Sequence, residues 1–358
     1  MSGDEIARTA ESLGGTIFSY SGYNSFGLQA KCFSSDAETF MKILADCLLS
    51  STFPVDEIAK QRLVQLAEID QEHERPFFLA QKELRAILFP HHPYRWFPLG
   101  SKETVKTIQR EDLLAHFRKH VLSGNLVVCV FGDITLSAVE KMAETYLRKI
   151  PKEQAGTVCS RPICSKAEPQ LPSRTKRREP KEQSILLEGF PGVDVKDSRY
   201  DALTILQTAM SGLSSDLAIA IREKRGLAYY VGAYQQAGIE PGMFVFYAGT
   251  REDAVEEVEK LVTQEICRIV DQGIREEELN RARNQIIADY EMGLQDNSSL
   301  TMNCALDELY GLGYSHAFTT RQRFEAITSE DVQQAAASII STNKLAISLV
   351  LPQKGEEK

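Results

Sequence analysis

The 358-residue sequence predicts an α+β fold of two tandem copies of one domain, each an antiparallel sheet with helices packed against it. Three observations predict it. Apolar residues recur at helical spacing in some segments and alternate in others. The two halves share residues at a constant offset, and a proline-rich polar stretch separates them. We therefore predict a first domain at residues 1–150, a linker at 151–183 and a second domain at 184–358.

The repeat has an offset of about 220 positions. Its equivalent pairs are Val105 and Phe324, Ile108 and Ile327, Glu111 and Glu330, Asp112 and Asp331, Leu113 and Val332, Leu126 and Leu345, Val128 and Ile347, and Val130 and Leu349. The second copy holds a strand and a helix at 184–210 before its central strands, whereas the first copy begins almost at the helix that precedes those strands. We therefore expect the first domain to be N-terminally truncated by about 60 residues.

In the first half, the strand prediction depends on the alternation of Phe26, Leu28 and Ala30, and the helix prediction on apolar faces such as Phe40 with Ile43. The predicted elements are a helix at 4–13, a strand pair that includes the alternating residues 26–32, a helix at 36–48, a helical stretch at 55–88 that breaks near Pro76, a helical stretch at 101–122 and a buried strand at 126–131.

In the second half, the same patterns continue after the linker. The predicted elements are a strand at 184–189, a helix at 198–210, strands at 227–233 and 243–248, a helix that begins at Thr250 or Asp253 and runs to Ile269, helices over 276–312, a helix at 329–340 and a strand at 345–351. The linker holds five prolines between Pro151 and Pro180. We interpret its basic cluster (Arg174, Lys176, Arg177 and Arg178) as solvated linker rather than as a docking patch.

Composition excludes several classes of partner. The formal net charge of −9 argues against a nucleic-acid-binding face, which needs basic residues. No apolar run reaches membrane-spanning length, and the polar N-terminus is no signal peptide. The seven cysteines show no pairing pattern, which indicates a reducing compartment. We expect a cytoplasmic protein without a nucleic-acid or membrane partner.

The segment SSDLAIAIREKRGLAYYV, residues 214–231, is the most informative stretch. It predicts a short capped helix that Gly226 ends, followed by a strand. Arg222 then lies near the helix end and Tyr229 on the strand. A guanidinium and a phenol in this arrangement can bind a carbonyl or an oxyanion. The alternative is a surface arginine and a half-buried tyrosine with no ligand.

A second pair of residues has metal-compatible spacing. His116 and His120 are four residues apart on a predicted helix. Lys119 takes the place of a general base, however, and no carboxylate completes the set. We therefore expect no metal role for these histidines.

Three stretches carry a resemblance to a known family. They are LGSKETVKTIQREDLLAHFRKHVLSGNLVVCVFGD, EQSILLEGFPG and the segment at 214–231. The chain resembles the pitrilysin/insulinase family of inverted zinc metallopeptidases, in particular proteins like the mitochondrial processing peptidase. The resemblance implies a zinc site formed by H-x-x-E-H and a downstream glutamate. It also implies that Arg222 and Tyr229 hold the carbonyl of an extended substrate peptide.

The sequence departs from this family at the metal. H-x-x-E-H is absent, Glu68 matches only the third-ligand position, and Gln61 replaces a further family glutamate. A catalytic zinc needs three protein ligands, so we expect this chain to bind no zinc and to be inactive alone.

Three functions follow from the resemblance. The first is a truncated zinc metalloendopeptidase that still binds peptide or unfolded polypeptide. The second is a non-catalytic substrate-binding subunit of a two-chain peptidase. The third is a structural subunit like the core subunits of the bc1 complex, which Arg222 and Tyr229 disfavour. An apolar sheet face left uncovered predicts a homo- or hetero-oligomer.

Overall fold

The computed structural model describes residues 1–152, 169–212 and 214–353. The chain divides into two compact units. Unit 1 contains Met1–Glu68, the segment that begins at Pro98, and Glu291–Thr319. Unit 2 contains Ile69–Phe97, the segment that ends at Tyr290, and the segment that begins at Thr320. The predicted boundaries at 150 and 184 separate the two copies of the repeat. The compact units do not coincide with these copies, because unit 1 includes Glu291–Thr319 from the second half of the sequence and unit 2 includes Ile69–Phe97 from the first half.

Unit 2 is built on a five-stranded sheet in the order β3-β7-β4-β6-β5. The strands are β3 (Ser173–Glu179), β4 (Ser184–Pro191), β5 (Ala228–Gln236), β6 (Met243–Thr250) and β7 (Ala346–Pro352). All neighbours pair antiparallel except β3 and β7, which are parallel. The α+β class is confirmed, with this one parallel pair as an addition.

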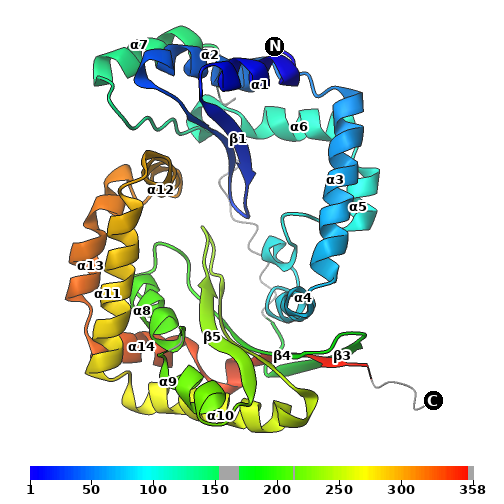
Figure 1. Cartoon of the computed structure of the whole chain (residues 1–358), viewed down its shortest axis with the longest axis vertical. Coiled ribbons are helices and arrows are strands. Elements are labelled where there is room, and N and C mark those ends of the chain that lie inside the picture. The colour runs from blue at the N-terminus through cyan, green and yellow to red at the C-terminus, as the bar shows by residue number, and fades with distance from the viewer. Residues whose placement is uncertain (153–168, 213, 354–358) are drawn as a thin grey trace. The chain divides into compact units, whose positions relative to one another are not determined.

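Helices cover both faces of this sheet (Figure 1). One face packs on α8 (Tyr200–Met210), α10 (Val255–Gln272) and α14 (Ser329–Ile339), and the other on α4 (Pro76–Leu88). The central strand β4 is buried on both faces, because Leu186 and Phe190 enter one core and Ile185 and Leu187 the other. Burial on both faces explains why three consecutive residues of β4, Ile185–Leu187, are apolar.

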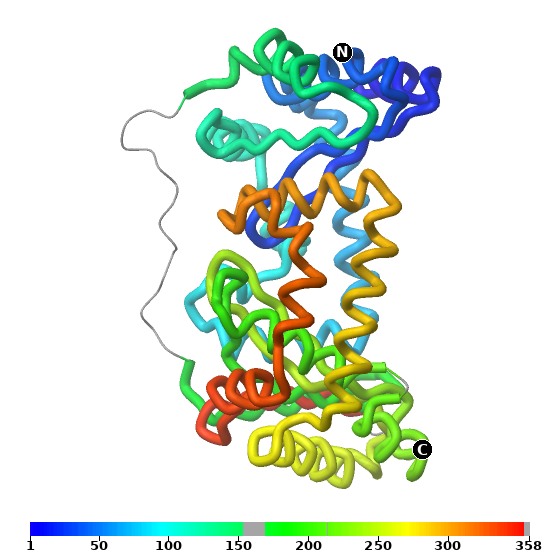
Figure 2. Tube along the Cα trace, turned by 90° about the vertical axis from the view of Figure 1, so that its left-hand side faces the viewer, coloured from blue at the N-terminus to red at the C-terminus, as the bar shows by residue number. Residues whose placement is uncertain are grey.

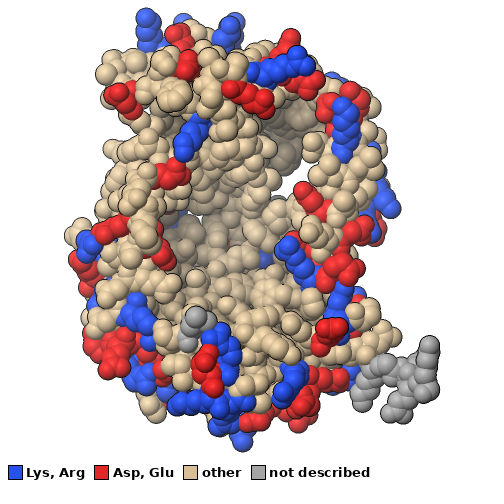
Figure 3. Space-filling view, in the orientation of Figure 1, with Lys and Arg blue, Asp and Glu red and all other residues tan. Residues whose placement is uncertain are grey.

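The strand β3 corrects the predicted linker. Ser173–Glu179, which the sequence analysis places inside 151–183, is an edge strand paired with β7. Its basic cluster is engaged in ion pairs: Arg174 binds Glu259 at 2.6 Å, Arg177 binds Glu83 at 3.0 Å and Arg178 binds Glu252 at 2.7 Å. A strand so rich in charge forms at this edge because each arginine meets an acidic neighbour. Figure 3 likewise shows acidic and basic side chains interspersed around α9 and α10.

Unit 1 contains a two-stranded antiparallel sheet of β1 (Thr16–Ser21) and β2 (Phe26–Lys31). Its helices are α1 (Gly3–Ser12), α2 (Ala37–Leu49), the part of α3 (Val55–His73) up to Glu68, α5 (Lys102–Thr107), α6 (Arg110–His120), α7 (Leu136–Tyr146) and α12 (Asn297–Leu309). The predicted break near Pro76 is confirmed, since α3 ends at His73 and Pro76 begins α4. Figure 1 shows the β1–β2 hairpin beside α1 and α2.

The predicted buried strand at 126–131 is wrong. The segment has no regular secondary structure, and Val128, Val130 and Phe131 are exposed by 45%, 37% and 45%. Its apolar alternation is real. Among the described residues, however, no neighbouring strand supplies the hydrogen bonds that a strand requires.

Helices α11 (Glu276–Gly293) and α13 (Thr320–Ala326) run side by side in unit 2 (Figure 2). Two hydrogen bonds join them: Arg283 of α11 donates to the carbonyl oxygen of Phe324 at 3.1 Å and to that of Ile327, just after α13, at 2.7 Å. The short helical turns are η1 (Ser34–Asp36), η2 (Pro93–Arg95), η3 (Ser123–Asn125), α9 (Asp216–Ala218), η4 (Ile219–Glu223), η5 (Glu252–Ala254), η6 (Tyr314–Thr319) and η7 (Thr342–Lys344). Among the described residues, no helix is both long and apolar enough to cross a membrane.

Candidate functional site

The segment that carries Arg222 begins with a capped helical turn. The Ser215 hydroxyl accepts a hydrogen bond from the Ala218 amide at 3.1 Å and starts α9. The next turn, η4, is a π-helix in which the Lys224 amide donates to the Ile219 carbonyl at 2.9 Å. Single π turns are rare and occur frequently at functional sites. Arg222 lies inside this turn.

Gly226 ends the helix as predicted. Its φ is +62°, its amide donates to the Arg222 carbonyl at 2.9 Å, and the Leu227 amide donates to the Ile221 carbonyl at 3.0 Å. This left-handed closure satisfies carbonyls at the helix end and reverses the chain into β5. Arg222 and Tyr229 are thereby placed on consecutive elements, η4 and β5, which pack together.

A β-bulge exposes Tyr229. In the pairing of β5 with β6, Ala228 lies opposite Thr250 and Tyr230 lies opposite Gly249, so Tyr229 is the extra residue. Bulges redirect a side chain in this way. Tyr229 is 57% exposed, whereas the preceding Ala228 and Val231, two residues further on, are each 7% exposed. The phenol of Tyr229 is thus exposed to solvent. The sequence analysis placed Tyr229 on a strand but did not predict the direction of its side chain.

Arg222 is partly exposed, with 29% of its side chain accessible. It forms an ion pair with the adjacent Glu223, in which the Arg222 Nε donates to Glu223 Oε1 at 2.8 Å. Such a pair between neighbouring surface residues contributes little stability, so the guanidinium can exchange this carboxylate for another acceptor. Among the described residues, no hydrogen bond or ring contact joins Arg222 to Tyr229.

The outer edge of β5 is capped by side chains at Ala233 and Gln235. The Ser211 hydroxyl donates to the Ala233 carbonyl at 2.9 Å and accepts from the Ala233 amide at 3.2 Å. The Gln235 amide donates to the Gln207 side-chain oxygen at 2.7 Å. These side chains from the end of α8 satisfy the backbone groups of an edge strand. At Ala233 and Gln235 these side chains occupy the hydrogen-bonding positions that an added strand would use. The sequence analysis did not identify this capping role of Ser211 and Gln207.

Glu68 does not belong to a metal-competent set. It is exposed on α3 in unit 1, whereas Arg222 and Tyr229 belong to unit 2. Among the described residues, the only three side chains whose ligand atoms converge are Asp216, Glu265 and Glu278. The family zinc would need three protein ligands, and Glu68 with Gln61 cannot supply them. The residues present do not fit a catalytic zinc.

The Asp216–Glu265–Glu278 cluster is an ion-pair network. Arg268 bonds Glu265 at 2.6 Å and Glu278 at 3.0 Å, and Arg275 bonds Asp216. Glu278 is buried and also accepts from the Arg275 amide at 2.7 Å. The two guanidiniums occupy the space in which a cation would lie, and the network ties the start of α9 to α10 and α11.

The histidine pair also lacks a completing ligand. The rings of His116 and His120 on α6 lie 4.4 Å apart between centroids. Burial lowers the pKa of His120, and the neighbouring His116 and Lys119 lower it further. Among the described residues, no carboxylate or thiol joins them in a three-ligand group.

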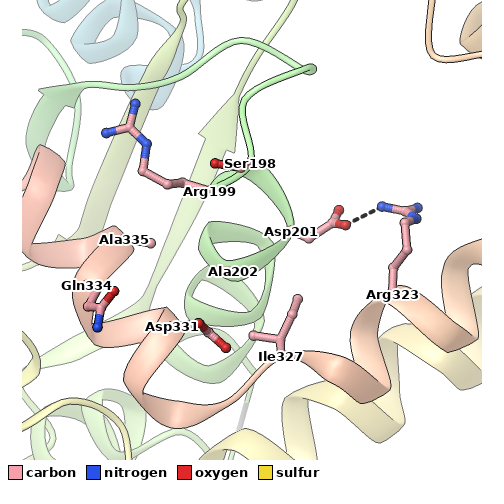
Figure 4. Close-up of a pocket in the computed structure, with 9 residues that line it drawn as sticks. All are labelled: Ser198, Arg199, Asp201, Ala202, Arg323, Ile327, Asp331, Gln334 and Ala335. Carbon is pink, nitrogen blue, oxygen red and sulfur yellow. Dashed lines mark hydrogen bonds and ion pairs between the residues drawn. The ribbon is translucent and has the colours of Figure 1, made fainter.

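One cavity, of about 620 Å³, lies between α8, α13 and α14 in unit 2 (Figure 4). Both arginines that line it are in ion pairs. Arg323 pairs with Asp201, toward which it points in Figure 4, and Arg199 pairs with Asp197 at 2.6 Å. Its arginines are therefore already neutralised, and it does not include Arg222 or Tyr229.

Comparisons with protein families and curated proteins agree with each other. The family model described as Insulinase (Peptidase family M16) matches residues 1–95, and the one described as Peptidase M16 inactive domain matches residues 107–286. An uncharacterized zinc protease of Rickettsia bellii is 28% identical over 80% of this chain and 68% of its own length. An uncharacterized zinc protease of Streptomyces coelicolor is 24% identical over 99% of this chain and 77% of its own length.

Solved structures confirm the fold. The peptidase M16 inactive domain from Pseudomonas fluorescens superposes with a TM-score of 0.85 at 24% identity, covering 99% of this chain and 85% of that one. A chain of complex III2 from Candida albicans superposes with a TM-score of 0.78 at 18% identity, covering 97% of this chain and 85% of that one. The α+β fold of this chain is thus also the fold of a peptidase M16 inactive domain and of a chain of complex III2.

Proposed function

This chain belongs to peptidase family M16, the insulinase family, and we propose that it binds an extended peptide or unfolded polypeptide through unit 2. Arg222 and Tyr229 donate hydrogen bonds to backbone carbonyl oxygens of that peptide. The observation that carries the proposal is the bulge that turns Tyr229 to solvent directly after the turn that holds Arg222. Capping of the β5 edge by Ser211 supports recognition through these two side chains.

We further propose that the chain does not hydrolyse this peptide alone. The sequence contains no H-x-x-E-H, and Glu68 is a single exposed carboxylate with Gln61 seven positions earlier. Zinc chemistry in the family supplies an activated water. In our proposal another polypeptide segment provides those ligands, which makes this chain the substrate-binding part of a peptidase.

A structural role like that of a respiratory-complex core subunit is the second candidate. The likeness to the complex III2 chain supports it at the level of the fold alone. The exposed Tyr229 and weakly paired Arg222 favour the peptide-binding function, because a purely structural subunit needs neither. We place the protein in the cytoplasm, which the five free cysteines among the described residues support.

The test is a titration of the purified chain against a fluorescein-labelled unstructured peptide, with fluorescence anisotropy as the readout. Arg222→Ala is expected to weaken binding about tenfold, since a charge-assisted hydrogen bond contributes roughly 1.5 kcal/mol or more. Tyr229→Phe, which removes only the hydroxyl, is expected to weaken it about fivefold. Both variants should retain the melting temperature of the unmodified chain.

Arg225→Ala is the matched control, because Arg225 lies in the same segment but pairs with Glu257 at 2.7 Å. Its affinity should stay within a factor of two of the unmodified chain, which is the order expected for an exposed pair. Equal affinity of the Arg222→Ala, Tyr229→Phe and unmodified proteins would contradict the proposed peptide site.

A further inference from the structure

The alternation of side chains along β5 is interrupted at Tyr229. Ala228 and Val231 both belong to the core on the face of the sheet that α8 and α10 cover. Tyr230 and Tyr234 instead pack against the core on the opposite face, which α4 covers. In a regular strand, residues three positions apart such as Ala228 and Val231 lie on opposite faces. The extra residue in the bulge therefore allows both parts of β5 to bury their apolar side chains.

The ring of Tyr230 fills the place of a side chain that the neighbouring strand lacks. Gly249 of β6 lies opposite Tyr230. A Cβ atom on Gly249 would lie 2.6 Å from Cε1 of the Tyr230 ring. Carbon atoms in favourable contact are about 3.5–4.0 Å apart, so the ring lies directly over the glycine backbone. Any residue with a side chain at position 249 would displace the ring from this place.

Two further aromatic rings hold Tyr230 against Gly249. Phe77, in the first turn of α4, meets Tyr230 edge-on with ring centroids 6.4 Å apart. The ring of Tyr247 on β6 lies 6.1 Å from that of Tyr230, and Phe77 also meets Tyr247 edge-on at 5.5 Å. Aromatic pairs in such geometries contribute stability beyond their buried area. The backbone of β5 is therefore fixed directly after Tyr229.

The backbone is also fixed directly before Tyr229. Ala228 is buried and lies opposite Thr250 of β6. The Thr250 side chain is buried as well, and its hydroxyl donates to the carbonyl oxygen of Leu227. The bulge thus has one anchor on each side, and Tyr229 lies between them. These two anchors determine where Tyr229 leaves the sheet.

We infer that Gly249 and Tyr230 are positioning residues for the phenol of Tyr229. The inference rests on the proposed function, in which that phenol donates a hydrogen bond to a carbonyl oxygen of the bound peptide. Without the bulge, Tyr229 would lie opposite Gly249, and Tyr230 would turn to the other face of the sheet, because a slip of one residue reverses every side chain. The fit of the Tyr230 ring over Gly249 selects the register that presents Tyr229 to the peptide.

The experiment measures binding of the fluorescein-labelled unstructured peptide to the whole chain by fluorescence anisotropy. Tyr230→Ala is expected to weaken binding about fivefold, as Tyr229→Phe does, because the phenol of Tyr229 loses its position. Tyr230→Phe keeps the ring over Gly249 and should bind the peptide as the unmodified chain does. Gly249→Ala, in which the new Cβ displaces the ring, should weaken binding by the same factor as Tyr230→Ala.

A double-mutant cycle separates positioning from a general loss of stability. Because Tyr230 acts through the phenol of Tyr229, Tyr230→Ala combined with Tyr229→Phe should bind the peptide no more weakly than either single variant. Gly189→Ala is the matched control. A Cβ at this position of β4 would meet Leu84 at 2.9 Å, and β4 does not pair with β5. This variant should lower the melting temperature and leave the peptide affinity unchanged.

Unchanged affinity of both Tyr230→Ala and Gly249→Ala would overturn the inference. Additive losses in the double variant would also overturn it, as would an equal loss for Tyr230→Phe. If Gly189→Ala lost as much affinity as Gly249→Ala, strain in the sheet would be a sufficient cause and the inference would be wrong. Failure of the proposed function has a different signature, because Tyr229→Phe itself would then bind like the unmodified chain, which would overturn both.

Discussion

At the scale of single residues, Glu188 is the most strongly perturbed carboxyl group. It lies in the centre of β4, is 1% exposed, and neither of its oxygens has a hydrogen bond of good geometry among the described residues. Burial raises its pKa to about 8, and the charge of Glu259 adds to this, against a weaker pull from Arg174 and the Thr263 hydroxyl. The carboxyl group of Glu188 is therefore protonated and uncharged inside the sheet at neutral pH.

We predict that Glu188→Gln stabilises the protein at alkaline pH. The folded state keeps a proton on Glu188 up to a pKa of about 8, whereas the unfolded chain releases it near 4.5. Stability therefore falls as pH rises between these values, by at most about 4–5 kcal/mol, and the loss is complete above pH 8. Glutamine should remove this slope. Urea unfolding at pH 6 and pH 8.5 measures it.

Glu277→Gln makes the same charge change at an exposed position of α11 and serves as the control. It should leave the pH dependence of the unfolding free energy as it is in the unmodified chain. If Glu188→Gln and Glu277→Gln gave the same slope between pH 6 and pH 8.5, Glu188 would not be the titrating group.

At the scale of elements, the turn from η4 into β5 positions the candidate site. Ser215 starts the helix, the π turn presents Arg222, Gly226 reverses the chain, and the bulge exposes Tyr229. The cap, the π turn and the closure at Gly226 are local, whereas the bulge depends on the pairing with β6. The ion-pair network around Glu278 ties the start of this segment to two long helices. The geometry of the site therefore depends on a few backbone conformations rather than on contacts between Arg222 and Tyr229.

Gly226→Ala is predicted to destabilise the protein by about 1–2 kcal/mol, because only glycine adopts a φ of +62° without cost. A Cβ at this position meets no atom within 4 Å, so the loss is conformational rather than steric. The urea midpoint measures it. Gly293→Ala in α11 is the control, since its Cβ is also free of neighbours and its φ is helical. That change should be neutral or stabilising, and equal midpoints for the two variants would contradict the role of Gly226.

At the scale of the whole chain, the repeat produces two copies with different completeness. Within the part of the chain that the structure describes, unit 2 has five strands and two covered sheet faces, whereas unit 1 has two strands and an exposed apolar segment at 126–131. The resemblance predicts the zinc ligands in the first half of the sequence, where Glu68 matches one ligand position. Arg222 and Tyr229, the residues of the proposed peptide site, lie in unit 2.

We expect the purified chain to bind less than one zinc per molecule and to cleave no peptide, because one exposed glutamate cannot complete a three-ligand site. Elemental analysis after dialysis and a peptide-cleavage assay with and without chelator measure this. A relative that carries H-x-x-E-H, purified in the same way, should retain metal and activity. One tightly held zinc per chain with chelator-sensitive cleavage would show that the prediction is wrong.

The sequence alone determined those features that depend on neighbouring residues. It predicted the break at Pro76, the end of the helix at Gly226, the amphipathic face of α10 and the duplication, because local backbone preference and apolar period decide them. Tertiary structure alone decided the charged strand β3, the bulge at Tyr229, the burial of Glu188 and the unpaired segment at 126–131. Each of these depends on which strand or helix lies opposite, and pairing between residues distant in the sequence leaves no local signal.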